Sequence, residues 1–144
     1  AEDGERLHLS VVGDGEEYHN LIRYEGEQVH FVGPVSPEEV KGYMAGADIL
    51  VMNSAFEGVP MTILEAVSYG LPVVSTNVGG IGETLRFGQD SEETDGTAEG
   101  IRAAIRRIGK CYEVYSENAY ENSKAYDYRI VNRKVYGVLE GFWQ

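Results

Sequence analysis

The chain has 144 residues, 42% of them hydrophobic and 25% charged, which is ordinary for a folded globular domain and excludes a disordered chain. The 12 Lys and Arg side chains against 24 Asp and Glu give a net charge of −12, and such an acidic surface makes nucleic acid a poor partner. The single cysteine, Cys111, excludes an internal disulfide and a cysteine-based metal site, and it suits a reducing compartment. This length fits one domain, which we take as residues 1–144.

Short apolar runs alternate with helical patterns along the first half of the chain. The expected strands are residues 7–12, 29–32, 48–52 and 72–75. The expected helices are residues 16–24, 37–46 and 62–69, with a short helix near Glu83. Strands separated by helices predict an α/β fold with a Rossmann-like parallel sheet flanked by helices. Because the strands are continuously apolar, we expect both faces of the sheet to be covered.

Several residues predict where helices begin and end. Ser36 followed by Pro37 is a start signal, and the acidic residues that come next favour the first turn. Gly70 is expected to end the helix that precedes it. Thr97 or Asp95 is expected to cap the helix over residues 98–108.

The second half of the chain is expected to hold one long loop and a helical tail. Residues 87–99 are acidic and turn-rich, so we expect a mobile surface loop. Residues 112–143 are helical in pattern and rich in tyrosine. The helical spacing of Tyr112 and Tyr115 favours packing against the body of the domain, and an aromatic surface for a partner domain is the alternative.

Ligands of parallel α/β sheets bind beyond the carboxyl ends of the strands. Four expected loops at that edge contain glycine, which lets a backbone approach a ligand closely, and they cover residues 13–15, 33–35, 54–60 and 76–80. The usual nucleotide fingerprints fail, because Tyr18 occupies the last glycine position of a G-x-G-x-x-G pattern and no Walker A lysine is present. The histidines are scattered, so no metal site is expected.

The segment from Glu57 to Glu65 is the most informative part of the sequence. Glu57 falls in a loop, and Glu65 follows eight residues later, in the expected first turn of a helix. The amides of Met61 and Thr62 lie between them at the helix N-terminus, which suits a phosphate or a polar sugar group. Carboxylates beside it can accept hydrogen bonds from sugar hydroxyls. The alternative is a capping box, in which Glu65 bonds the backbone at Thr62.

The string over residues 54–74, followed by Asn77-Val-Gly-Gly80 and Glu83, resembles the donor-binding half of retaining glycosyltransferases of family 4, which have the GT-B fold. The segments 11–15 and 31–34 match the preceding strands and loops in the same order. The stretch near Tyr126 is similar to the C-terminal helices of the family. The resemblance covers about residues 7–142.

The resemblance implies a role for each matching residue. Glu57, as the catalytic-site carboxylate, contacts hydroxyls of the transferred sugar, and Glu65 contacts the ribose of the nucleotide. The backbone amides implied for the sugar and the diphosphate are those of Gly58, Met61 and Thr62. The nucleobase is implied at residues 33–35, which include Gly33 and Val35, with Gly13 close to the same pocket.

The implied reaction transfers a hexose from a nucleoside-diphosphate sugar with retention and without a metal or other cofactor. The basic pair that neutralises the diphosphate in the family lies before residue 7 in the resemblance, and the acceptor-binding N-terminal domain has no counterpart here. We therefore expect a fragment of a larger two-domain enzyme that is inactive alone, in the cytoplasm or at the cytoplasmic face of a membrane. A GT-B sugar-nucleotide epimerase domain and a non-catalytic nucleotide- or partner-binding module remain alternatives.

Overall fold

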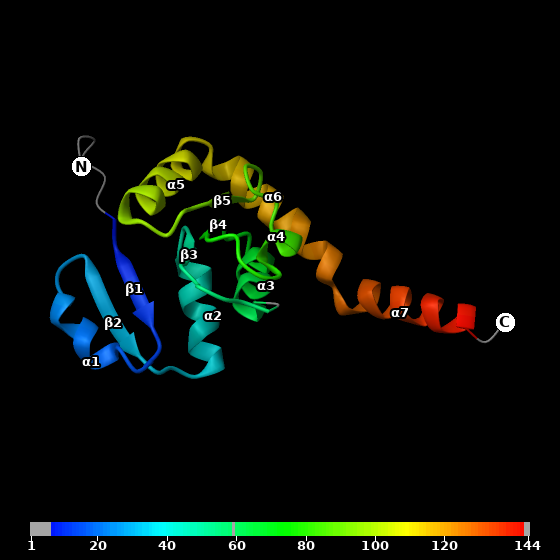
Figure 1. Cartoon of the computed structure of the whole chain (residues 1–144), viewed down its shortest axis with the longest axis horizontal. Coiled ribbons are helices and arrows are strands. Elements are labelled where there is room, and N and C mark those ends of the chain that lie inside the picture. The colour runs from blue at the N-terminus through cyan, green and yellow to red at the C-terminus, as the bar shows by residue number, and fades with distance from the viewer. Residues whose placement is uncertain (1–6, 59, 143–144) are drawn as a thin grey trace. The chain divides into compact units, whose positions relative to one another are not determined.

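A computed structural model describes residues 7–58 and 60–142 of the chain (Figure 1). The chain divides into two compact units, Ala1–Tyr43 and Met44–Gln144, which we call unit 1 and unit 2. The strands are β1 (Leu9–Val12), β2 (Val29–Gly33), β3 (Leu50–Met52), β4 (Val73–Ser75) and β5 (Ser91–Glu93). The α-helices are α1 (Tyr18–Leu21), α2 (Pro37–Gly46), α3 (Met61–Ser68), α4 (Ile81–Thr84), α5 (Ala98–Lys110), α6 (Tyr112–Ser123) and α7 (Tyr128–Phe142). Two 3-10 helices, η1 (Ile22–Tyr24) and η2 (Lys124–Tyr126), extend α1 and α6.

In unit 1, β1 and β2 pair in parallel, with Leu9 opposite Val29 at the start of the ladder. The ring of Tyr18 in α1 packs edge-on against Phe31 in β2, with 6.2 Å between the ring centroids. Leu9 is 48% exposed, so the prediction that both faces of every strand are covered is wrong for β1. The reason is that unit 1 holds only two described strands, α1 with its 3-10 extension and the first part of α2, which together offer little apolar surface to cover the strands.

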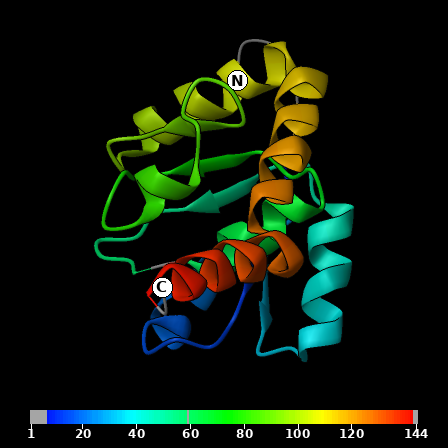
Figure 2. The same cartoon turned by 90° about the vertical axis from the view of Figure 1, so that its right-hand side faces the viewer.

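In unit 2, the strands β3, β4 and β5 form a parallel sheet with β4 in the centre. Neighbouring residues of a strand point to opposite faces, so Val73 and Val74 enter different clusters. Val73 packs with residues of α3, α4 and α6, whereas Val74 packs with Ala104 and Ile108 of α5. Figures 1 and 2 show α5 and α3 on the two sides of this sheet. The predicted α/β fold is confirmed, and its parallel strands form two sheets.

The prediction of a mobile loop over residues 87–99 is wrong, because these residues contain β5, which pairs in parallel with β4. The side chains of Asp90 and Ser91 are fully buried, and Glu92 is 8% exposed. Acidic side chains tolerate burial when they are hydrogen-bonded or paired. Asp90 Oδ1 accepts a hydrogen bond from the Arg86 amide at 2.9 Å, and burial raises the pKa of Asp90.

Glu92 is held by partners from two helices that follow it in the chain. Arg107 Nε in α5 lies 2.5 Å from Glu92 Oε2, and the hydroxyl of Tyr115 in α6 donates a hydrogen bond to Glu92 Oε1. These partners satisfy the carboxylate of a strand that carries too few apolar residues to be recognised by its pattern. Burial, together with the neighbouring Glu92 carboxylate, raises the pKa of Tyr115 to about 12.

The predicted helix start and stop signals are confirmed. Ser36 Oγ accepts from the Glu39 amide at 3.3 Å, and the Glu39 carboxylate accepts from the Ser36 amide at 2.8 Å, which is a capping box. Thr97 caps α5 by accepting a hydrogen bond from the Gly100 amide at 3.0 Å. Gly70 follows α3 with a φ of +70°, a conformation that favours glycine.

The predicted helical tail is confirmed as α6, η2 and α7. Tyr112 and Tyr115 pack against the cluster around Val74, as their spacing predicts. Tyr120, Tyr128 and other tyrosines of the tail are exposed. Within residues 7–58 and 60–142, no helix has both the length and the apolar character needed to cross a bilayer.

Removing the Tyr115 hydroxyl is expected to weaken unit 2. Tyr115→Phe leaves a nearly buried carboxylate with one donor fewer, which lowers the free energy of unfolding by about 1–2 kcal/mol at pH 7. Because the folded-state pKa of Tyr115 lies above the unfolded value of about 10, its contribution is complete below pH ~10 and is lost as the pH rises through about 12. The stability difference between wild type and variant should therefore shrink over that range in chemical denaturation.

Tyr136→Phe is the matched control, because this substitution also removes a tyrosine hydroxyl from the tail, and Tyr136 is 66% exposed. It should leave both the stability and its alkaline profile unchanged. A Tyr115→Phe protein with wild-type stability and the wild-type profile would show that the contact to Glu92 contributes nothing to folding.

Candidate functional site

The loops after β3 and β4 are joined at the carboxyl edge of the sheet in unit 2. Thr76 Oγ1 donates a hydrogen bond to the Ser54 carbonyl at 2.7 Å. The amide of Gly80 donates to the Gly58 carbonyl at 3.1 Å. The two loops therefore form one backbone platform, as predicted from their position after neighbouring parallel strands.

Glu57 lies half-buried in the first of these loops. The Ser54 hydroxyl donates a hydrogen bond to Glu57 Oε1 at 2.8 Å. No hydrogen bond to Glu57 Oε2 comes from the described part of the chain. One carboxylate oxygen is thus held in place and the other remains able to accept a hydrogen bond from a ligand.

Gly79 makes the closest approach between the two loops. Its φ is +56°, and a Cβ atom built on it would lie 1.7 Å from the carbonyl oxygen of Glu57. No residue with a side chain fits at this distance, so glycine is required for the loop after β4 to reach the Glu57 backbone.

The helix α3 follows this platform directly and presents free backbone donors. Its N-cap is Pro60, whose carbonyl accepts from the amides of Ile63 and Leu64 at 3.0 and 3.2 Å. The amides of Met61 and Thr62 have no backbone acceptor among the residues that the structure describes. Unpaired N–H groups and the helix dipole make this end of α3 suited to an anionic or hydroxyl-rich ligand.

The capping-box alternative for Thr62 and Glu65 is wrong. The helix begins at Met61, one residue earlier than predicted, and no side chain caps it. The extended backbone of Pro60 (φ −75°, ψ 99°) takes the N-cap position, so Thr62 already lies inside the helix. Glu65 is consequently in the second turn instead of the first, and it is exposed.

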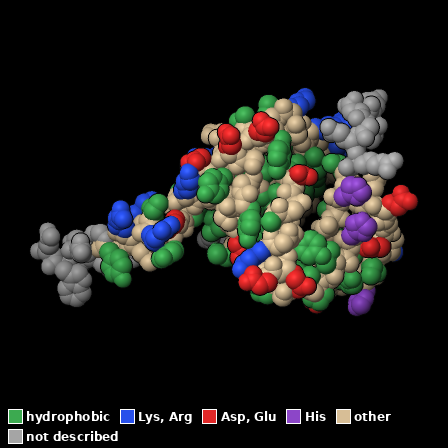
Figure 3. All heavy atoms as spheres, turned by 180° about the vertical axis from the view of Figure 1, so that it is seen from behind, with side chains coloured by type: hydrophobic (Ala, Val, Ile, Leu, Met, Phe, Trp, Pro, Cys, Tyr) green, Lys and Arg blue, Asp and Glu red, His purple; other side chains and the backbone are tan. Residues whose placement is uncertain are grey.

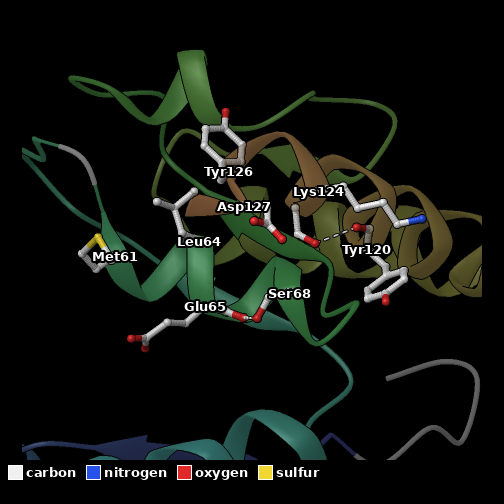
Figure 4. A pocket seen from close by; sticks show the side chains of 9 residues that line it. Met61, Leu64, Glu65, Ser68, Tyr120, Lys124, Tyr126 and Asp127 are labelled. Carbon is white, nitrogen blue, oxygen red and sulfur yellow. Dashed lines mark hydrogen bonds between the residues drawn. The ribbon is translucent and has the colours of Figure 1, made fainter. Parts of the chain in front are cut away.

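Glu65 also borders a hollow of about 400 Å³ between α3 and the tail, shown in Figure 4. The hollow is lined by Met61, Leu64, Glu65 and Ser68 from α3 and by Tyr120, Ser123, Lys124, Tyr126 and Asp127 from the tail. The Tyr126 hydroxyl bonds the Glu83 carbonyl at 3.2 Å, and Asp127 pairs with Arg129. In Figure 4 the Glu65 carboxylate extends away from Tyr126 and Asp127. These tail residues therefore do not engage the carboxylate of Glu65.

In unit 1, the predicted site residues lie where β1 and β2 end. The amide of Gly13 (φ +126°) donates to the carbonyl of Gly33 (φ +77°) at 2.9 Å, which brings these two loops together. Gly13 also lines a hollow of about 150 Å³ bordered by Tyr18 and Phe31. Val35 is half-buried and follows β2 by two residues.

Each unit therefore gathers its own predicted residues: Gly13 and Gly33 in unit 1, and the Glu57 loop with the start of α3 in unit 2. Sequence reasoning missed Ser54 and Thr76, which hold the Glu57 loop. Two features of the sequence could have indicated them. Ser54 is a hydroxyl residue three positions before Glu57, and Thr76 is a hydroxyl residue directly after the expected strand over residues 72–75.

The site in unit 2 carries carboxylates without matching cations, since the segments 53–66 and 76–80 contain no Lys or Arg. On the face shown in Figure 3, several Lys and Arg side chains gather on α7, away from the sheet of unit 2. Among the described residues, no group of three or more His, Cys, Asp or Glu side chains is arranged to hold a metal ion. A phosphorylated ligand would here be bound by backbone N–H groups unless other cations are supplied.

The sequence is similar to those of known glycosyltransferases. The sulfoquinovosyl transferase SQD2 of Arabidopsis thaliana is 27% identical over 94% of this chain, which spans 29% of that relative. The lipopolysaccharide core biosynthesis glycosyltransferase LpsE of Rhizobium meliloti is 34% identical over 71% of this chain, which spans 31% of its length. The chain thus corresponds to about a third of these relatives.

Solved structures share the fold. A sucrose-phosphate synthase from Thermosynechococcus elongatus matches 96% of this chain and 38% of its own, with a TM-score of 0.77 and 21% identity. Anabaena HepE in complex with UDP-glucose matches 93% of this chain and 41% of its own, with a TM-score of 0.71 and 27% identity. These proteins have the GT-B glycosyltransferase architecture, which the described chain shares in part.

The sequence also matches the family described as "Glycosyl transferases group 1" over residues 1–110, well over half of the chain. The match includes β1 to β5 and the whole segment from Glu57 to Glu65. The chain belongs to the group 1 glycosyltransferases.

Proposed function

We propose that this chain is the donor-binding domain of a retaining glycosyltransferase of family 4. It binds a nucleoside-diphosphate sugar and, together with an acceptor-binding domain outside this chain, transfers the hexose to an acceptor. The observation that carries the proposal is the half-buried Glu57, held by Ser54, in a loop that leads into the start of α3. There the amides of Met61 and Thr62 have no backbone acceptor among the described residues.

Each carboxylate has a different role in this proposal. Glu57 accepts hydrogen bonds from hydroxyls of the hexose, because one of its oxygens is fixed and the other has no donor among the described residues. Glu65 accepts from the vicinal hydroxyls of the ribose, because it is exposed on α3 and caps nothing. A hydrogen bond to a charged group contributes about 1.5–3 kcal/mol, so each contact affects affinity measurably.

The diphosphate lies at the N-terminus of α3 in the proposal. The amides of Met61 and Thr62 have no backbone acceptor in the described chain, and the Gly58 amide is proposed as a third donor. Gly58 belongs to the platform beside them, because its carbonyl accepts a hydrogen bond from the Gly80 amide. These donors stabilise the negative charge that grows on the leaving diphosphate, so they favour the transition state more than the bound substrate. Further cations come from outside the two segments of the site, which contain none.

The nucleobase is proposed to contact the loops of unit 1 that carry Gly13, Gly33 and Val35. The positive φ values of both glycines support a backbone that a planar ring can approach closely. HepE forms a complex with UDP-glucose, and this supports a uridine nucleotide as the first probe for the present chain.

The family match favours a transferase over the epimerase and the non-catalytic module. Retention of the anomeric configuration and transfer without a metal are parts of the proposal that follow from the family resemblance. The acceptor is proposed to bind outside this chain, which spans about a third of the relatives reported above.

The proposal predicts selective binding of one nucleotide sugar by the isolated chain. Titration calorimetry with UDP-glucose, GDP-mannose and ADP-glucose should show binding of at least one of them, and weak affinity is expected because the site lacks cations. Raising the salt concentration should weaken the binding only slightly, because backbone N–H groups supply most of the phosphate contacts. A chain that binds none of the three at millimolar concentration would contradict donor binding by this domain alone.

Glu57→Ala and Glu65→Ala should each weaken the binding about 10- to 100-fold through loss of a charged acceptor. Neither change should lower the thermal unfolding midpoint appreciably, because Glu65 caps no helix and Glu57 has one side-chain partner. Glu117→Ala on α6 is the control, since it removes an exposed acid of the same unit. A loss of stability with unchanged affinity would show that the two acids are structural.

A further inference from the structure

We propose that Ser54 is a positioning residue for Glu57, and that the segment from Thr76 to Gly80 fixes Ser54 and Glu57 relative to the sheet. The inference rests on the proposed function, because Glu57 is taken there as the acceptor for the hexose. The inference adds Ser54 and the segment from Thr76 to Gly80 as residues that set the affinity for the sugar and not the affinity for the nucleotide.

The first support is the contact between the two side chains. Ser54 Oγ donates to Glu57 Oε1 at 2.8 Å, and both residues are half-buried. A carboxylate on a loop can adopt several rotamers, and a single fixed oxygen removes most of them. The remaining oxygen, Oε2, then points in one direction, which a ligand hydroxyl can meet without first ordering the side chain.

The second support is the way in which the Ser54 backbone is held. Its carbonyl accepts from Thr76 Oγ1 at 2.7 Å, directly after β4. The Thr76 amide reaches back to the Met52 carbonyl at the end of β3, at 3.4 Å. The backbone of Ser54 is therefore fixed to the residue that follows the central strand, β4. This fixes the position from which the Ser54 hydroxyl donates its hydrogen bond.

The third support is the contact on the other side of Glu57. A Cβ atom on Gly79 would lie 1.7 Å from the Glu57 carbonyl oxygen and 2.8 Å from its carbonyl carbon. The Gly80 amide bonds the next carbonyl, that of Gly58, at 3.1 Å. The backbone of Glu57 thus contacts the loop after β4 through Gly79. The side chain of Glu57 is held by Ser54, which the same loop holds through Thr76.

These contacts act on the sugar end of the ligand only. Ser54 touches Glu57 and not the amides of Met61 and Thr62, which are proposed to meet the diphosphate. Loss of the Ser54 hydroxyl should therefore lower the preference for UDP-glucose over UDP and leave the affinity for UDP unchanged. A general loosening of the fold would weaken both ligands together.

The experiment measures dissociation constants of the full chain for UDP-glucose and for UDP by calorimetry. Ser54→Ala should reduce the preference for UDP-glucose about 3- to 10-fold, the size of one neutral hydrogen bond. Ser54→Thr keeps the hydroxyl and should restore it. Ser123→Ala is the control, because the one described partner of the Ser123 hydroxyl is the Tyr120 carbonyl in its own helix. An unchanged preference in Ser54→Ala would overturn the positioning role while leaving the proposed function intact.

A second measurement does not depend on ligand. In side-chain NMR, Glu57 should occupy one χ1 rotamer in the wild type and in Ser54→Thr, and should average between rotamers in Ser54→Ala. Averaging in the wild type would overturn the positioning role. A wild-type chain with an ordered Glu57 that binds none of UDP-glucose, GDP-mannose and ADP-glucose would overturn the proposed function alone.

Gly79→Ala tests whether the contact between Gly79 and the Glu57 backbone is needed, and Gly88→Ala is the matched control. Both glycines have positive φ, so both variants are strained alike, but a Cβ on Gly88 meets nothing within 4 Å. Gly79→Ala should therefore reduce the preference for UDP-glucose over UDP as Ser54→Ala does, whereas Gly88→Ala should keep it. Equal preferences in the two variants would show that the contact with Glu57 is not needed for sugar recognition.

Discussion

The close approach of Gly79 to the Glu57 backbone is the constraint on which the site in unit 2 depends. A side chain at residue 79 would occupy the position of the Glu57 carbonyl oxygen, so the two loops can meet only through glycine. Once they meet, the Gly80 amide reaches Gly58, and the hydroxyl of Thr76 reaches Ser54. The backbone of the Glu57 loop is thereby held at the edge of the sheet, and the Ser54 hydroxyl holds the Glu57 side chain. This arrangement suits the proposed role of Glu57, because a ligand could bind the carboxylate without prior rearrangement.

The core of unit 2 keeps that edge in place. The buried face of α3, with Ile63, Ala66 and Val67, packs on the side of the sheet that carries Val73. This packing fixes the direction of the helix, and hence the direction of the Met61 and Thr62 amides at its start. The opposite face is closed by α5. The exposed residues Met61 and Glu65 lie on the same helix, so the buried face and the proposed ligand contacts use different sides of one element.

Much of this arrangement could be predicted from the sequence, because local signals carried it. Ser36 and Thr97 cap helices as expected, and the segment from Glu57 to Glu65 lies at the predicted edge. The strand β5 could not be predicted, since its buried acid Glu92 is satisfied by Arg107 and Tyr115, which are distant in sequence. The start of α3 differs from the prediction for a local reason: the pattern of hydroxyl and acid favours Thr62 as the cap, whereas the extended backbone of Pro60 takes that position. Contacts between distant residues leave no local periodicity, which is why the hydrogen bond from Thr76 to Ser54 could not be predicted. The hydrogen bond from Ser54 to Glu57 joins residues three apart, so a local signal for it was present in the sequence.

The most direct test of the account is an amide-resolved NMR titration of the full chain with UDP-glucose. Binding at the proposed site in unit 2 should shift the amides of Gly58, Met61 and Thr62 together with those near Gly79. Amides of α5, on the opposite face of the sheet, should stay in place. Shifts confined to α5 or to the tail, with the Glu57 loop and the start of α3 unaffected, would contradict the account.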